Sequence, residues 1–321
     1  MTPRYVVRRV VQVLPSLATI VVATFALVHA APGDPIVALA GEAGDEAYYE
    51  FMREKYGLDR PVPQQFLTYA GNLVQGDLGV SFTQGRSVAT VVAERLPATL
   101  LLMVTALALS TAAGIALGLL SAWRPFGRLD LAVNTAALVG YATPAFWLAQ
   151  LALLLLAFEA GLFPIQGMTD ARDPSRGFGH VLDVAHHLTL PALVLAVSEL
   201  ALVARLTRTG LLRELGSGYV RTAHSKGVGS GDALVRHALP NALLPVVTVI
   251  GTRLGMLFSG AVLVEIVFAW PGLGRLLLTA TQTRDYPVLL GLVLLVAVSV
   301  VVVNLVTDLA YAWIDPRIRY E

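Results

Sequence analysis

The sequence predicts an all-α integral membrane protein with six transmembrane helices. Of its 321 residues, 56% are hydrophobic and only 14% are charged, and the mean hydropathy is +0.69. Because a soluble domain carries about 25% charged residues, much of the surface must face lipid. Six stretches are long and apolar enough to span a bilayer, which takes roughly 20 residues. They are residues 10–31, 98–122, 131–157, 188–204, 243–268 and 287–312.

The first stretch follows Arg4, Arg8 and Arg9 and ends near the small residues of a Val28-His29-Ala30 triplet, as a cleaved signal peptide would. Its apolar run exceeds the 7–15 residues of a signal-peptide core, so we favour a retained span. With the N-terminus inside, the inner segments hold thirteen basic and five acidic residues, and the outer segments hold nine and fourteen. The positive-inside rule therefore predicts that both termini are cytoplasmic.

Between the first two spans, residues 32–97 form a long outer loop. Helical periodicity over residues 61–76 and Gly57 after residues 45–56 predict two short helices there. The loop is interpreted either as a docking surface or as a cap that only stabilises the bundle. With the first span it makes one predicted division, residues 1–97, and residues 98–321 make a five-helix core.

Inside the third span, Pro144 predicts a kink, either static or a hinge. Small residues four apart on two other spans predict close helix packing, within the chain or against a second subunit. They are Gly114 and Gly118 on the second span, and Gly251, Gly255 and Ser259 on the fifth.

Ionisable residues inside spans are costly and indicate function by default. Glu199 and Arg253 lie at overlapping depths, so we hypothesise an ion pair between them; the alternative is that each faces a watery cavity. Glu265 lies at the outer end of the fifth span.

The inner loop, residues 205–241, is basic and divided by glycines. Ser217 as N-cap and Gly227 at the C-terminal end predict a short helix between them. A basic helix beneath the membrane suits contact with a cytosolic partner, and the alternative is a solvated turn that touches lipid headgroups.

Several chemistries are excluded by the residue inventory. The chain has no cysteine and no Gly-Lys-Ser/Thr phosphate loop, so ATP would have to be hydrolysed on another chain. The balance of 23 basic and 22 acidic residues gives no support for nucleic-acid binding. His180, His186 and His187 form the best metal-like cluster, but we interpret them as part of a solvated interfacial loop.

The inner loop resembles the signature of bacterial ABC importer permeases, in the dipeptide/oligopeptide (peptide and nickel) B-type branch. That signature begins Glu-Ala-Ala and continues through a glycine to an apolar residue and Leu-Pro. Here Arg221, Thr222 and Ala223 occupy the first three positions, Gly227 keeps its spacing, and His237 replaces the apolar residue. Further matching motifs are Ala-Pro-Gly-Asp-Pro at 31–35, Gly-Leu-Asp-Arg-Pro at 57–61, Gly-Asp-Leu-Gly at 76–79, residues 264–274, Arg-Asp-Tyr-Pro at 284–287 and Asp-Pro-Arg-Ile-Arg at 315–319.

The resemblance implies a type I importer permease in the bacterial inner membrane, without bound cofactor and without catalysis of its own. It implies a second, different permease subunit, two cytoplasmic ATPase subunits that bind ATP and Mg²⁺, and an extracytoplasmic substrate-binding protein. Peptides are the implied solute, with nickel complexes, glutathione and other peptide-like solutes as alternatives. The implied coupling helix comprises Tyr219, Arg221, Thr222, Ala223, His224, Lys226 and Gly227. The resemblance also implies that Glu265 helps to shape an outer gate, and the alternative is that Glu265 accepts hydrogen bonds from the backbone of the following turn.

Two other classes compete with this interpretation. An ion-coupled secondary transporter would need matching broken helices in two sequence halves, and the sequence shows no internal repeat. An intramembrane enzyme would need a nucleophile and a base facing each other, and no such pair is visible.

Overall fold

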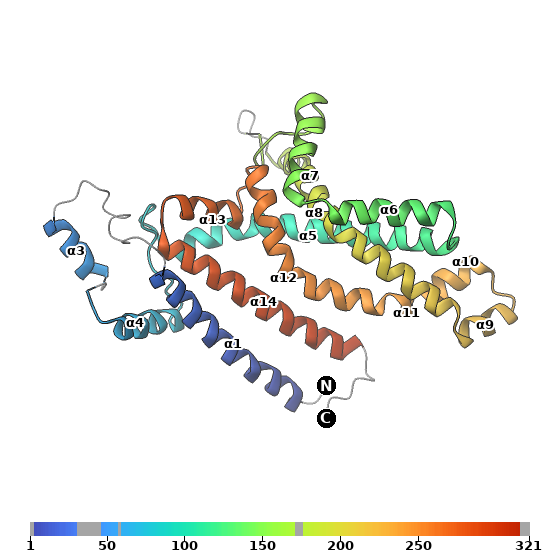
Figure 1. Cartoon of the computed structure of the whole chain (residues 1–321), viewed down its shortest axis with the longest axis horizontal. Coiled ribbons are helices and arrows are strands. Elements are labelled where there is room, and N and C mark those ends of the chain that lie inside the picture. The colour runs from blue at the N-terminus through green and yellow to red at the C-terminus, as the bar shows by residue number, and fades with distance from the viewer. Residues whose placement is uncertain (1–2, 31–45, 57–58, 171–175, 315–321) are drawn as a thin grey trace. The chain divides into compact units, whose positions relative to one another are not determined.

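The computed structural model describes residues 3–30, 46–56, 59–170 and 176–314, and every long element in these ranges is a helix (Figure 1). The chain divides into two compact units, residues 1–99 with 271–321 and residues 100–270. The helix α5, Val88–Trp123, begins in the first unit and ends in the second. The all-α class predicted from composition is thereby confirmed.

The first unit joins the two ends of the chain. Its long helices are α1, Pro3–Ala30, and α14, Tyr286–Ile314, which pack along each other. Its shorter helices are α3, Glu46–Tyr56, α4, Val62–Val74, and α13, Leu273–Gln282. The two predicted helices of the outer loop are thus confirmed as α3 and α4. Phe25 of α1 contacts the rings of Phe66 and Tyr69 on α4, so the predicted apolar face of α4 packs on the first span.

The second unit is built around α8, Phe178–Leu215, which contacts most of its other helices. The apolar helices beside it are α6, Arg128–Ala142, α7, Ala145–Ala152, and α12, Leu244–Val267. A π-helical segment, Leu153–Glu159, continues α7. Beyond α8 follow α9, Gly218–Ser225, α10, Ser230–Asp232, a second π-helical segment, Ala233–Ala238, and α11, Leu239–Ala242.

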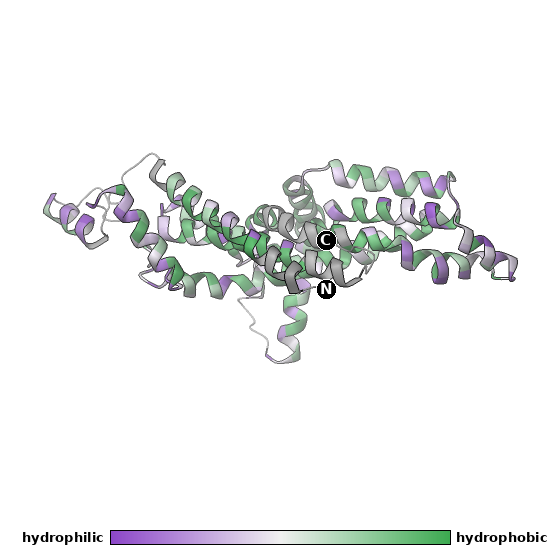
Figure 2. Ribbon diagram, turned by 90° about the horizontal axis from the view of Figure 1, so that it is seen from below, coloured by the Kyte–Doolittle hydropathy of each residue, from purple (hydrophilic) through white to green (hydrophobic). Residues whose placement is uncertain are grey.

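Length and hydropathy identify α5, α8 and residues 286–306 of α14 as helices able to cross a membrane, and the bent pair α6–α7 as a further broken span. The helices α1 and α12 coincide with the first and fifth predicted spans. Figure 2 shows hydrophobic residues along the long helices and hydrophilic residues at α3 and around α9.

The predicted boundaries of two spans are wrong. The helix α5 begins at Val88 and runs through Pro97, ten residues before the predicted second span. The helix α8 extends the fourth span at both ends, so His180, His186 and His187 are helical and not in a loop, and the first residues of the predicted inner loop are helical too. The bend predicted at Pro144 is confirmed, and it is larger than a kink: the third span is broken at Thr143 and Pro144, with 101° between α6 and the helix that begins with α7.

The predicted close packing of small residues occurs within the chain for the second span. A Cβ on Gly114 would lie 2.6 Å from the Cβ of Val203, and one on Gly118 would lie 2.6 Å from the Cβ of Thr207. Any side chain at these positions would push α5 off α8. The side chains of residues 251–260, including Gly251, Gly255 and Ser259, lie outside the described residues.

Candidate functional site

The basic helix predicted in the inner loop is α9. Ser217 is its N-cap residue, with an extended backbone, although its side chain forms no capping hydrogen bond. At the other end, the Val228 N–H donates to the Ala223 carbonyl at 3.2 Å and the Gly227 N–H donates to the His224 carbonyl at 2.9 Å. This is the Schellman pattern, and it needs the left-handed φ of +84° that Gly227 adopts one residue beyond the C-cap.

One face of α9 is buried against the ends of α5 and α8 and against the short elements that follow α9. Val220 is fully buried and Ala223 is 8% exposed. Fully burying a valine contributes roughly 1.5–3 kcal/mol. Their cluster also contains Ala122 of α5, Leu211 of α8, Ala242 of α11 and, from the second π-helical segment, Ala233, Leu234 and Ala238. The helix α9 is therefore fixed to the bundle by packing.

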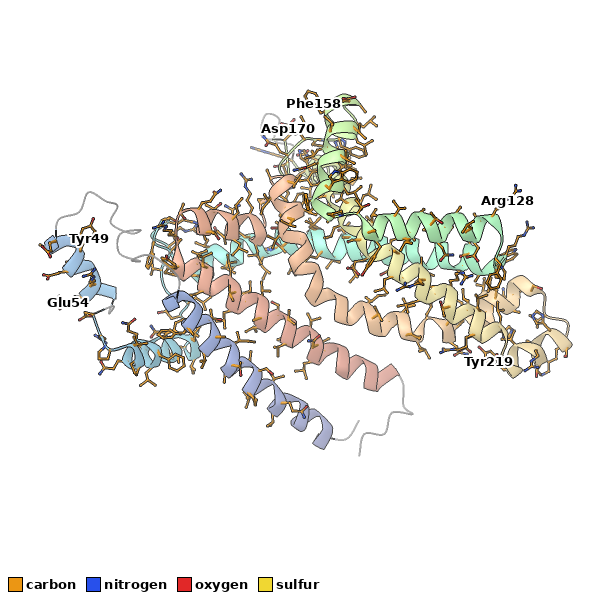
Figure 3. All side chains as sticks on the ribbon, in the orientation of Figure 1. Tyr49, Glu54, Arg128, Phe158, Asp170 and Tyr219 are labelled. Atoms are coloured by element: carbon orange, nitrogen blue, oxygen red, sulfur yellow. The ribbon has the colours of Figure 1, made fainter. Side chains whose placement is uncertain are left out.

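Tyr219 adds a polar connection at the same junction (Figure 3). Its hydroxyl donates to Glu214 Oε2 at 2.9 Å, lies 3.3 Å from the His237 carbonyl oxygen, and accepts a hydrogen bond from Asn241 Nδ2 at 2.9 Å. These contacts join α9 to the C-terminal turn of α8 and to α11. A displacement of α9 would therefore pull on both helices.

The opposite face of α9 is open to solvent and basic. Arg221, Thr222, His224 and Lys226 are all exposed. The Thr222 hydroxyl donates to the Gly218 carbonyl, and His224 Nδ1 lies 3.1 Å from the Val228 carbonyl oxygen. Arg221 and Lys226 thus present positive charge outward from a rigid, eight-residue helix.

The predicted pathway residues are placed as follows. Glu199 lies on α8 and is partly buried, Pro144 is the N-cap of α7, and Glu265 is fully buried near the end of α12. The Glu265 carbonyl accepts a hydrogen bond from the Trp270 N–H at 2.8 Å. Arg253 lies on α12, but its side chain is outside the described residues. The Glu199–Arg253 ion pair therefore stays a prediction.

His186 and His187 each contact a neighbouring group of the protein. His187 Nδ1 lies 3.0 Å from Asp183 Oδ1, and His186 Nε2 lies 3.0 Å from the Leu162 carbonyl oxygen. In the part of the chain that the structure describes, no three His, Asp or Glu side chains converge as metal ligands.

Sequence analysis missed a buried ion pair between α6 and α8. The side chain of Asp130 is 4% exposed and accepts two hydrogen bonds of 2.7 Å from Arg208 Nε and Nη2. Further donors to its carboxylate are Ser121 Oγ, Asn134 Nδ2 and the Phe126 N–H. Asp130 and Arg208 are 78 residues apart, and no local motif predicts that they pair.

The same carboxylate holds an unfavourable backbone in place. Phe126 has φ +63°, a left-handed conformation that costs a non-glycine residue about 1–2 kcal/mol. Its N–H donates to Asp130 Oδ2 at 2.7 Å, and Arg208 lies 5.6 Å from the centre of its ring. The Asp130 network therefore fixes the turn between α5 and α6.

A second missed carboxylate, Asp285, organises the first unit before α14. It is 1% exposed and accepts hydrogen bonds from Ser81 Oγ at 2.6 Å, Thr83 Oγ1 at 2.8 Å, and the N–H groups of Phe82 and Thr83 at 3.1 Å. Burial raises the pKa of this carboxyl, but the hydrogen bonds outweigh burial and leave its pKa below the ordinary value.

Comparison with known structures concerns the fold. The fold matches a chain of the MetNI methionine ABC transporter, solved in inward-facing conformations, with a TM-score of 0.55 over 71% of this chain and 97% of that one. The identity is 15%, so the match concerns the fold alone. The predicted fold, that of the membrane subunit of an ABC importer, is confirmed.

Comparison with sequence families then identifies the chain. A model for the binding-protein-dependent transport system inner membrane component matches residues 114–320, and its N-terminal companion matches residues 2–103. The chain belongs to this family and is a permease subunit. It is 40% identical over 337 residues to the dipeptide transport system permease protein DppB of Escherichia coli, with 99% of both chains covered.

Other relatives are the oligopeptide transport system permease protein AppB of Bacillus subtilis and the di/tripeptide transport system permease protein DppB of Pseudomonas aeruginosa. They are 39% and 38% identical, each over at least 98% of this chain and 99% of its own length. The resemblance predicted from short motifs therefore extends over the full length.

Proposed function

We propose that this chain forms the translocation pathway for di- and oligopeptides in an ATP-driven importer of the bacterial inner membrane. Near-full-length identity of 38–40% to permeases named for dipeptides, oligopeptides and di/tripeptides supports the solute class. The excess of basic residues on the side of α9 supports cytoplasmic termini. ATP and Mg²⁺ belong to two partner ATPase subunits, and an extracytoplasmic binding protein delivers the solute.

The observation that carries this proposal is α9, a basic helix fixed to the ends of α5, α8 and α11. A helix buried on one face and charged on the other suits the transfer of a partner's movement to the bundle. Tyr219, Arg221, Thr222, Ala223, His224, Lys226 and Gly227 are its proposed coupling residues. Closure of the ATPases would then rock this subunit as a rigid body against a second, different permease subunit.

The proposed pathway residues are Glu199, Arg253, Glu265 and Pro144. Ionisable groups within spans and a broken helix are typical of solute pathways in transporters. We propose that the bend at Pro144 and the buried Glu265 shape the outer end of the path. Alternating access would expose the pathway to each side of the membrane in turn.

The test is co-purification of the tagged chain, followed by ATP hydrolysis in liposomes with dipeptides, glutathione or a nickel complex. We expect two ATPase subunits, a second permease and hydrolysis stimulated by a peptide-loaded binding protein. Removing both exposed charges, R221Q with K226Q, should weaken retention of the ATPase about tenfold. The control is R236Q, because Arg236 is equally exposed but lies outside α9 and pairs with Asp232.

Two results would count against the proposal. A chain recovered without any ATPase would favour a secondary transporter. Equal ATPase retention by the double variant and the R236Q control would remove the coupling role of α9 while leaving the family assignment intact.

A further inference from the structure

An open cavity of about 470 Å³ lies where α6 meets α8, next to the turn between α5 and α6. Phe126, Arg128 and Leu131 line it from the turn and from the first turns of α6, and Arg208 lines it from α8. Both α5 and the α6–α7 pair qualify as membrane spans. The turn that joins them therefore lies at a membrane surface, where lipid headgroups meet water.

The cavity carries a net positive charge. Asp130 and Arg208 neutralise each other through their paired hydrogen bonds. Arg128 is exposed and, among the described residues, forms no ion pair; Figure 3 shows it extending from the end of α6. Arg124, on the adjoining turn, is also exposed. The guanidinium group of Arg128, which lines the cavity, therefore leaves it with one unneutralised positive charge.

Apolar side chains surround the same opening. Of the lining residues, Phe126 is 90% exposed and Leu131 is 70% exposed. Phe126 has an unfavourable, left-handed φ and an exposed ring. Strained backbone of this kind is concentrated at ligand-binding and other functional sites. Aromatic rings with nearby arginines are typical of the membrane–water interface, so hydrocarbon is the expected cover for these side chains.

We propose that this cavity binds the phosphate of an anionic glycerophospholipid headgroup, with Arg128 contacting the phosphate and Phe126 and Leu131 contacting the first acyl carbons. Basic pockets between transmembrane helices bind anionic lipid headgroups for this reason. Free phosphate shares the charge chemistry but would leave the apolar rim uncovered. A lipid satisfies both parts of the site.

The test is native mass spectrometry of the full chain, delipidated in detergent and titrated with three probes: short-chain phosphatidylglycerol, phosphatidylcholine of the same chain length, and inorganic phosphate. We expect one phosphatidylglycerol to bind at least fivefold more tightly than phosphatidylcholine, with phosphate weaker than both. R128Q should weaken phosphatidylglycerol binding about fivefold. R205Q, at an exposed arginine of α8 outside the cavity lining, should leave it unchanged.

A second variant distinguishes a loss of lipid binding from a folding defect. L131Q keeps every charge and should weaken the lipid but not inorganic phosphate, with an unchanged thermal unfolding midpoint. The proposal is overturned if phosphatidylglycerol and phosphatidylcholine bind equally, if phosphate binds as tightly as the lipid, or if R205Q weakens binding as much as R128Q.

Discussion

Replacing Asp130 by alanine should destabilise the second unit more than most single substitutions. The change removes the only carboxylate in the described part of the cavity and orphans donors on Arg208, Ser121 and Asn134. Removing one partner of a buried ion pair costs about 3–5 kcal/mol. Because the Arg208 side chain is 19% exposed, water recovers part of that cost. We expect D130A to lower the free energy of unfolding by about 2–3 kcal/mol.

The reverse change, R208M, should cost about as much. Asp130 then keeps its hydrogen bonds from Ser121, Asn134 and the Phe126 N–H, but its carboxylate, whose side chain is only 4% exposed, loses its counter-charge, so we expect a loss of about 2–3 kcal/mol. In the double variant the two losses should not add, because each single change already breaks the same pair. The loss of stability in the double variant should be at least about 1 kcal/mol smaller than the sum of the two single losses.

The assay is reversible unfolding in mixed detergent micelles, followed by tryptophan fluorescence. E94Q is the matched control, because it breaks an ion pair with Arg86 in which both side chains are about half exposed, and it should change nothing measurable. A D130A variant within about 0.5 kcal/mol of the wild type, or strictly additive losses, would refute the account of a buried, coupled pair.

Three further outcomes are expected. G118L should prevent α5 from packing on α8, because even its Cβ would lie 2.6 Å from the Cβ of Thr207; protease digestion in membranes should show the loss. G227A should keep membrane insertion but lower ATP-coupled uptake, since alanine at φ +84° costs about 1 kcal/mol at the end of α9; normal uptake would contradict this. The low pKa of Asp285 stabilises the folded chain above the ordinary carboxyl pKa, and this contribution is lost as the pH falls through the folded value. D285N should therefore be less stable than the wild type at pH 7. The difference between their thermal unfolding midpoints should become smaller below about pH 4. A difference that does not change with pH would contradict the pKa shift.

Features that depend on neighbouring residues could be predicted from the sequence. The helix α9 is one: Ser217, Gly227 and the cations between them are local signals, and its ends lie where these residues place them. Pro144 likewise marked the interruption of the third span. The size of the bend could not be predicted, because a proline breaks a helix but tertiary packing sets the angle that follows.

Features that depend on distant residues were missed. Hydropathy marks the long apolar part of a helix. The helices α5 and α8 continue beyond it through segments interrupted by charged residues and histidines, such as Glu94 and His180, which explains the boundary errors at Val88 and Phe178. Asp130 and Arg208 looked like ordinary charges flanking spans, and nothing within a few residues of either one indicates the other. Pairings of this kind follow from how α6 and α8 pack.

The contact between the Ser81–Thr83 turn and Asp285 can form only late in the synthesis of the chain. Ser81 and Asp285 are 204 residues apart, which a ribosome covers in roughly 10–40 s at 5–20 residues per second. During that interval the hydroxyl groups of Ser81 and Thr83 and the N–H groups of Phe82 and Thr83 lack the carboxylate that accepts their hydrogen bonds in the folded chain. A chain that stops short of Asp285 can pair these donors only with water or with other groups of the turn. The first unit is therefore completed only when translation is almost finished.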